Sequence, residues 1–303
     1  MRVYYIHLLV FLAFSLCGCN AAKNKFYQWN ENLNDFSIRT LEKLDHEDDV
    51  DKLGGVFKSN SQCLQDTLIL NITEQKKGGF YVDLAANHYK SLSNTYSLER
   101  YNQWEGICIE ANPNLRSDLV VNRNCSLFVN PVAARTGETI TFRLARAGFD
   151  SLGGIVGEDT DNSNKNADGG VELEMLTVTL GALLDYIKAP AVMDYLSLDI
   201  EGSEYHAMMG MDFSKYTFNM ITIERPVHHL HLLLNRHGYR FVYIMSRFGE
   251  CFYVHTSYSK YDEIMKKYHS KELSGSTVWN DVALDASQAP RPHDYLWIPA
   301  YGE

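Results

Sequence analysis

Residues 78–113 of this 303-residue chain read GGFYVDLAANHYKSLSNTYSLERYNQWEGICIEANP, and this stretch decides the fold. Its first apolar run ends in Asp83, as a buried parallel strand closed by a carboxylate would. A turn of small residues, 84–87, follows, where the lack of side-chain bulk lets a ligand approach the backbone. The spacing of apolar residues then predicts a helix over 90–101, and a second short strand, 106–109, ends in Glu110.

The two acids lie 27 residues apart, near the offset at which a strand-end carboxylate can bind ribose hydroxyls. The pattern therefore indicates half of a nucleoside-binding site. Apolar strands are predicted downstream at 126–129, 139–145, 171–180, 193–200 and 219–223, followed by an antiparallel pair at 240–246 and 250–255. Helices are expected at 113–121, 203–211 and 226–237. Alternating strands and helices predict an α/β fold with a doubly wound sheet.

Several blocks of sequence, in order, resemble the FkbM family of S-adenosylmethionine-dependent methyltransferases. They are VDLAAN (82–87), SLSNTYSLE (91–99), WEGICIEANP (104–113), DYLSLDIEGSEYHAM (194–208) and MITIE (220–224). The likeness covers residues 61–255. It implies a Rossmann-like, seven-stranded sheet of the class I methyltransferase type. It also implies methyl transfer from S-adenosyl-L-methionine to a hydroxyl oxygen.

The resemblance also implies which residues bind the methyl donor. Asp83, Ala85 and Asn87 match the first motif of the family, Glu110 matches its ribose-binding acid, and Asn130 follows the third strand. The usual motif has glycine where this chain has Ala85 and Tyr89. A tyrosine ring at the second position either turns outward or weakens donor binding.

The catalytic candidates are Asp199, Glu201 and His88. Asp199 and Glu201 lie two residues apart at the end of a predicted strand, so both can face a ligand cleft and accept a proton from an acceptor hydroxyl. His88 lies beside the donor turn. We expect Asp83, Glu110 and Asp199 to point into one shared pocket.

A metal site is not predicted. His228 and His231 lie three apart on a predicted helix, with Glu224 just before it, but no recognised metal-binding motif supports a shared ion. Ordinary solvated or helix-end histidines are the favoured interpretation of this spacing. Glu204 is expected in the first turn of a helix, where an acid favours the helix dipole.

Composition narrows the possible partners. The net charge is −10, and no cluster of lysine and arginine offers a surface for nucleic acid or an anionic membrane. Apolar residues make up 45% of the chain and charged residues 22%, which is ordinary for a globular protein. Within the methyltransferase hypothesis that the resemblance implies, the expected acceptor is a glycan or a small metabolite. The sequence does not indicate an oligomeric state.

The N-terminus predicts a targeting segment. Residues 1–22 hold one arginine, a 14-residue apolar run and a region of small residues, which is typical of a cleaved signal peptide. The run is shorter than the ~20 residues of a usual spanning helix. A short signal-anchor, or acylation at Cys19, would instead attach the protein to a membrane. All three alternatives imply a secretory or envelope location.

The six cysteines fit that location. Two lie in the leader; Cys108 falls in a core strand and is interpreted as a small buried hydrophobe, as is Cys251. Cys63 and Cys125 remain as candidates for a disulfide.

The domain organisation follows from these segments. Residues 23–60 are a polar lead-in with a helix near 36–44, and 61–256 form the methyltransferase-like domain. Gln65-Asp66 is interpreted either as a cap on a helix above the pocket or as plain N-capping. The polar loop 148–170 is expected to be a lid on the substrate side. Residues 257–303 are expected to form a helix and an aromatic tail packed on the domain.

Two functional classes stay open. The first is an O-methyltransferase, and the second is a binding module on a methyltransferase fold that has lost activity, which the residues Ala85 and Tyr89 favour. A nicotinamide dehydrogenase is disfavoured because no G-x-G-x-x-G follows the first strand.

Overall fold

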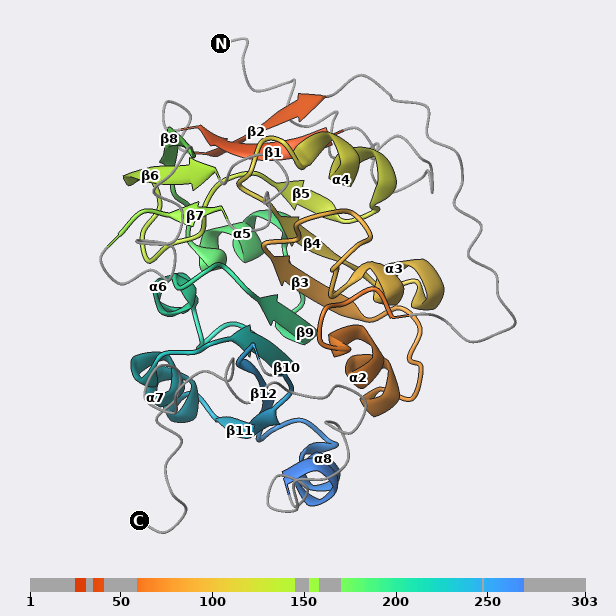
Figure 1. Ribbon diagram of the computed structural model, residues 1–303. Helices are drawn as coiled ribbons and strands as arrows, with labels where there is room; N and C mark the ends of the chain where they lie inside the picture. The colour runs from red at the N-terminus through yellow and green to blue at the C-terminus, as the bar shows by residue number, and fades with distance from the viewer. Residues whose placement is uncertain are drawn as a thin grey trace, which may run out of the picture.

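Apolar runs of the sequence form the strands of a nine-stranded mixed sheet in the computed structural model (Figure 1). The structure describes residues 25–30, 35–40, 59–144, 153–157, 170–246 and 248–269. In spatial order the strands are β11 (Tyr239–Ile244), β12 (Glu250–His255), β10 (Thr217–Glu224), β9 (Val192–Leu198), β3 (Phe80–Leu84), β4 (Glu105–Ile109), β5 (Ser126–Phe128), β1 (Lys25–Asn30) and β2 (Asp35–Thr40).

Six neighbouring strands, from β10 to β1, run parallel, and antiparallel strands flank them on both sides. The strand order reverses between β9 and β3, which creates a topological switch point at their carboxyl ends. Open α/β sheets bind ligands at such a point.

Helices cover both faces of the sheet (Figure 1). One face carries α2 (Gln65–Ile72), α3 (Tyr96–Asn102), α4 (Arg116–Asn122) and α8 (Tyr261–Tyr268), which share one apolar cluster with Tyr81, Tyr195 and Phe252 of the sheet. The other face carries α5 (Leu180–Ile187), α6 (Glu204–Met209) and α7 (His228–Arg236), packed on Val82, Leu84 and Leu196. Alternate residues of β3 therefore point to opposite helical layers.

A smaller antiparallel sheet of β7 (Gly154–Ile155), β6 (Thr139–Leu144) and β8 (Val171–Leu176) lies next to the main one. Phe142 and Leu144 of β6 pack with Ala111, which follows β4, in a third apolar cluster. The small sheet is thereby fixed over the carboxyl end of the main sheet.

The expected count of seven strands is wrong, because an N-terminal hairpin adds two. The sequence predicted a helix near 36–44, yet Asp35–Thr40 pairs with Lys25–Asn30 and β1 then joins β5 in parallel. Cross-strand pairing with a distant segment overrides the local helical preference.

Two helices begin later than predicted. The helix expected over 90–101 begins at Tyr96, because Leu92 adopts a left-handed backbone (φ 60°) and His88 Nδ1 accepts hydrogen bonds from the Lys90 and Ser91 amides. The helix expected from 113 begins at Arg116, after a turn in which Asn112 Oδ1 accepts from the Asn114 amide. In both cases side chains bound to nearby amides compete with the first helical turn.

The disulfide prediction is also wrong. Cys108 in β4 is bonded to Cys125, with Cα atoms 5.7 Å apart, and Cys63 is not disulfide-bonded. Cys108 pairs in register with Leu127 of the adjacent β5, so Cys125 lies within reach of its sulfur. The sequence does not show that an apolar strand cysteine has such a neighbour.

Among the described residues, none of the helices has both the length and the apolar character needed to cross a membrane. The leader 1–22, most of the loop 148–170 and the aromatic tail after residue 269 lie outside the described residues. The helix predicted in the C-terminal segment is α8.

Candidate functional site

A pocket opens where the carboxyl ends of β3, β4, β5 and β9 meet the small sheet. Its hollow measures about 430 Å³, part of it open to solvent, and its wall includes Ala85, Glu110, Asn130, Phe142, Ile155 and Ser203. Three of the five predicted donor-binding residues, Ala85, Glu110 and Asn130, line it.

The turn after β3 forms one side of the pocket. Ala85 and Asn87 both have left-handed backbones, with φ of 65° and 53°. The amides of Ala85 and Ala86 donate to the Ile109 carbonyl at 3.0 Å, and the Asn87 amide donates to Glu110 Oε2 at 2.8 Å. Strained backbone that the surroundings hold in place is concentrated at functional sites.

Glu110 is the acid of this pocket. Its side chain is only 6% exposed, and Oε1 accepts a hydrogen bond from the Asn112 amide at 2.8 Å. Burial raises the pKa of Glu110 to about 7, although hydrogen bonds from the Asn112 and Asn87 amides lower it. A carboxyl group held by two amides keeps further lone pairs for hydroxyl donors.

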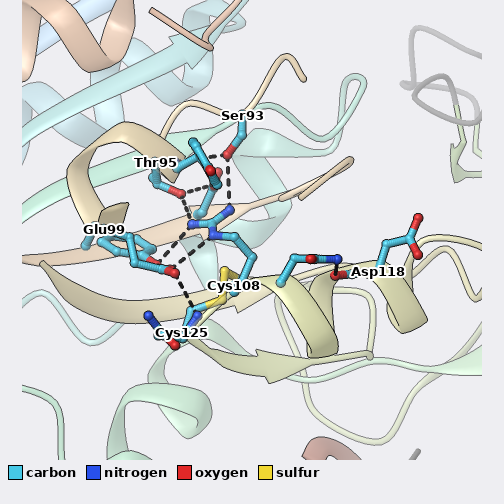
Figure 2. A network of polar contacts seen from close by, with 12 residues as sticks. Ser93, Thr95, Glu99, Cys108, Asp118 and Cys125 are labelled. Atoms are coloured by element: carbon cyan, nitrogen blue, oxygen red, sulfur yellow. Dashed lines mark hydrogen bonds and ion pairs between the residues drawn. A yellow bond between two sulfur atoms is a disulfide. The ribbon is translucent and has the colours of Figure 1, made fainter. Parts of the chain in front are cut away.

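Asp83 does not share this pocket. It points to the layer of α3, where Thr95 Oγ1 donates to its Oδ2 at 2.5 Å. Arg123 lies beside it in a buried polar network with Glu99 and Ser93 (Figure 2). Glu110 lines the pocket, whereas Asp83 and Asp199 do not, so the prediction that all three acids share one pocket is not confirmed.

Asp199 lies in a separate group of carboxylates at the ends of β9 and β10. One oxygen each of Asp199, Glu201 and Glu224 lies within 4.8 Å of the others. Arg225 Nη2 donates to Glu224 Oε2 at 2.5 Å and to Glu201 Oε2 at 3.1 Å. Burial, followed by the negative charges of Glu224, Glu250 and Glu201, raises the pKa of Asp199 well above its usual range.

Backbone strain recurs at this carboxylate group. Glu201 and Arg225 have φ of 57° and 46°. Glu204 Oε1 accepts from the Ile200 and Gly202 amides, both at 3.0 Å, and so holds the loop between β9 and α6. Glu204, expected only to favour a helix dipole, is a buried loop anchor.

Gln65 and Glu250 are site residues that the sequence did not single out as such. Glu250 in β12 is 2% exposed, and burial raises its pKa to about 8, while hydrogen bonds from Thr222 and Gln65 lower it. Gln65 opens α2, and its hydrogen bond to Glu250 places this residue of the Gln-Asp pair beside the carboxylates. The Gln-Asp motif could have pointed to Gln65. No sequence feature pointed to Glu250, which follows a hairpin turn.

Asp66 has a different role from both interpretations. The N-cap of α2 is Leu64, and Asp66 instead accepts hydrogen bonds from the hydroxyls of Ser59, Ser61 and Ser97. It ties the segment before α2 to α3.

The side chains of Asn130, His88 and Tyr89 form contacts within the fold. Asn130 Oδ1 accepts from the Trp29 amide at 2.6 Å and Nδ2 donates to the Leu176 carbonyl at 2.9 Å, so its side chain joins β1 to β8. His88 Nδ1 caps its own turn. The Tyr89 ring packs on His88 and Tyr96 instead of lining the pocket.

The group of possible metal ligands in the described part of the chain contains neither His228 nor His231. His231 Nδ1 lies 3.4 Å from the Tyr253 hydroxyl, which fits an ordinary packed histidine.

These features define an α/β protein with a small-molecule pocket at the switch point of its sheet. The sequence matches the methyltransferase FkbM domain over residues 83–241, and the chain belongs to this family of methyltransferases.

A solved structure that the chain resembles is the precorrin-6y C5,15-methyltransferase of Geobacter metallireducens GS-15. The two share 12% sequence identity and a TM-score of 0.32, over 62% of this chain and 85% of that one. A comparison with curated proteins found no matching relative.

Proposed function

We propose that this protein is an S-adenosylmethionine-dependent O-methyltransferase that acts on a hydroxyl of a glycan or small metabolite. The observation that carries the proposal is the buried carboxyl group of Glu110 in the switch-point pocket of an FkbM-family chain. The position is the one at which a strand-end acid binds ribose hydroxyls.

The residues of the pocket fit the methyl donor. Glu110 supplies acceptors for ribose hydroxyls, and the Ala85 turn brings backbone close to the ligand. Phe142 and Ile155 supply an apolar wall suited to a flat base. The donor, when bound, supplies an electrophilic methyl group. What the protein must add is alignment of the two reactants and removal of one proton.

The carboxylate group of Asp199, Glu201 and Glu224 supports an acceptor side next to the donor pocket. Ile200, which lines the pocket, lies between Asp199 and Glu201 in the chain, so the carboxylates are close to the pocket wall. A carboxyl group with a raised pKa is a suitable proton acceptor near neutral pH. We assign Asp199 as the base and Glu201, fixed by Arg225, as a group that binds the acceptor hydroxyl. His88 is a weaker candidate for the base because its Nδ1 already accepts hydrogen bonds from two backbone amides.

The position of Tyr89 weakens the alternative of an inactive binding module. Its ring packs beside Tyr96 and leaves the donor turn clear, which removes the main argument for lost donor binding.

We also propose a secretory or envelope location, with membrane attachment only through the N-terminal segment. The leader pattern of residues 1–22 supports it, and so does the Cys108–Cys125 disulfide, because disulfides persist mainly in oxidising compartments. Nucleic acid is not an expected partner at a net charge of −10.

Calorimetric titration of residues 23–303 with S-adenosylmethionine and with S-adenosylhomocysteine tests the proposal. We expect a dissociation constant on the order of micromolar, and Glu110→Ala should weaken binding at least about tenfold by removing ribose contacts. The exposed Glu105→Ala is the control and should bind like wild type. Failure of the folded wild-type protein to bind either ligand would remove the proposal.

A further inference from the structure

Arg123 is a fully buried guanidinium outside the donor pocket, with only 2% of its surface exposed. Its Nε donates to Glu99 Oε2 at 3.0 Å and its Nη1 to Ser93 Oγ at 3.1 Å. Its Nη2 donates to the Tyr81 hydroxyl at 3.0 Å and to Thr95 Oγ1 at 2.7 Å (Figure 2). Burying a guanidinium is costly even when it has four hydrogen-bond partners, so we looked for a role for Arg123.

The network reaches the donor pocket through Thr95. The hydroxyl that accepts from Arg123 donates to Asp83 Oδ2. Asp83 directly precedes the turn whose Asn87 amide donates to Glu110 Oε2. A path of hydrogen bonds and four peptide units thus runs from Arg123 to the ribose-binding acid.

Charge balance makes this chain sensitive to Arg123. Two buried carboxyl groups, Asp83 and Glu99, face one guanidinium. Burial raises the pKa of Asp83, and Arg123, Thr95 and Ser197 lower it. Without the guanidinium, Asp83 would stay protonated up to a higher pH. A protonated Asp83 carries its own O–H group, which would compete with the Thr95 hydroxyl as the donor of their hydrogen bond.

The disulfide fixes the segment that carries Arg123. The Asn124 amide donates to Glu99 Oε1 at 2.7 Å, and Cys125 is bonded to Cys108 of β4. Glu110 follows Cys108 by two residues. The disulfide therefore links the arginine segment directly to the strand that presents the ribose acid (Figure 2).

We infer that Arg123 is a positioning residue for the donor pocket: through Thr95 it keeps Asp83 in place beneath the donor turn, and the Cys108–Cys125 disulfide holds it there. The inference rests on the proposed function. It separates Arg123 from the residues that touch the donor, because the pocket wall does not include it.

The variants are Arg123→Gln, Arg123→Lys and Cys108→Ala/Cys125→Ala, each measured for unfolding and for donor affinity. We expect Arg123→Gln to weaken binding at least about tenfold at the lower of two assay pH values, with part of the loss recovered at the higher one, where more of Asp83 is ionised. Arg123→Lys keeps the positive charge but lacks the planar guanidinium group, so its donor affinity should lie between those of the wild type and Arg123→Gln. The double variant Cys108→Ala/Cys125→Ala should weaken donor binding by the same factor at both pH values.

Lys76→Gln is the matched control. Lys76 pairs with Asp194, which also accepts from the Phe80 amide, so this ion pair lies at the opposite end of the same strand β3. Its loss should leave donor affinity and its pH profile unchanged. If Arg123→Gln does not fold, Arg123→Gln/Glu99→Gln removes the unpaired charge of Glu99 while Asp83 stays uncompensated, and the same pH profile is expected.

Two results would overturn the inference: wild-type affinity in a folded Arg123 variant, or an equal loss at both pH values, which a purely structural role would give. A wild-type protein that binds no donor sinks the proposed function instead. The inference is then decided by ¹³C NMR of the Asp83 carboxyl carbon. Its midpoint must rise in Arg123→Gln and stay unchanged in Lys76→Gln.

Discussion

Ala85 shows how a single residue can carry strain at a binding turn. Its φ of 65° lies in the left-handed region, where a Cβ crowds the following carbonyl and costs roughly 1–2 kcal/mol. The motif of the family has glycine here. The turn keeps its shape because the Ala85 and Ala86 amides are both bound to the Ile109 carbonyl.

Ala85→Gly should stabilise the protein by about 0.5–1 kcal/mol, since relief of the left-handed strain exceeds the entropy that glycine adds to the unfolded chain. Urea unfolding followed by circular dichroism measures this change. The adjacent Ala86, buried and without a positive φ, is the control, and Ala86→Gly should destabilise. Equal effects of the two substitutions would contradict the strain argument.

At this scale the sequence located Glu110, Ala85 and Asp199 at the carboxyl edge correctly. It did not show that Asp83 would bond Thr95 and lie outside the pocket wall, because that depends on the segment that packs against the strand. The roles of Asn130 and His88 also escaped it. Their hydrogen-bond partners are the Trp29 amide and Leu176 carbonyl for Asn130 and the local Lys90 amide for His88.

Among the elements, β1 and the small sheet are joined to the pocket by one side chain. Asn130 accepts from Trp29 of β1 and donates to Leu176 of β8, and is itself 2% exposed. Water could take over the two hydrogen bonds of the buried Asn130 side-chain amide only if a cavity opened to hold it.

Asn130→Ala should lower the free energy of unfolding by about 2–4 kcal/mol, because it removes the partners of one buried amide and one buried carbonyl. Thermal and urea unfolding measure the loss. Asn124→Ala, at an exposed side chain a short distance along the chain, should change stability by less than about 0.5 kcal/mol. A loss at Asn130 no larger than at Asn124 would show that the hydrogen bonds to β1 and β8 do not matter.

The order and type of most elements from β3 to β12 followed from periodicity and from the glycine and proline positions. The exceptions have two causes. The pairing of β1 with β5 and the disulfide depend on which distant segment lies next to a residue, and a local pattern does not hold that information. The start of α3 depends on hydrogen bonds from nearby amides to the His88 side chain, which compete with the first helical turn.

For the molecule as a whole, the concentration of buried acids sets the response to pH. Burial raises the pKa of Glu110 and Glu204 to about 7 and that of Glu250 to about 8, against an ordinary value of 4.5. These three carboxyl groups therefore bind more protons in the folded state than in the unfolded state between about pH 4.5 and pH 8, and their contribution to stability falls as pH rises through that window.

Glu250→Gln should flatten this fall, most clearly in the upper part of the window, because glutamine cannot ionise. The effect is on the order of a few kcal/mol. Free energies of unfolding from urea titrations between about pH 5 and pH 8.5 test it, with the exposed Glu105→Gln keeping the wild-type slope. Wild-type stability that rises across this range would contradict the assignment.

The parallel pairing of β1 with β5 sets a condition on the order of assembly. Phe26 is in register with Leu127, so the first strand emerges from the ribosome about a hundred residues before its partner exists. Until then the edge of β1 that later pairs with β5 is open to pairing with other strands. The two strands at this edge of the sheet are thus made early and docked late.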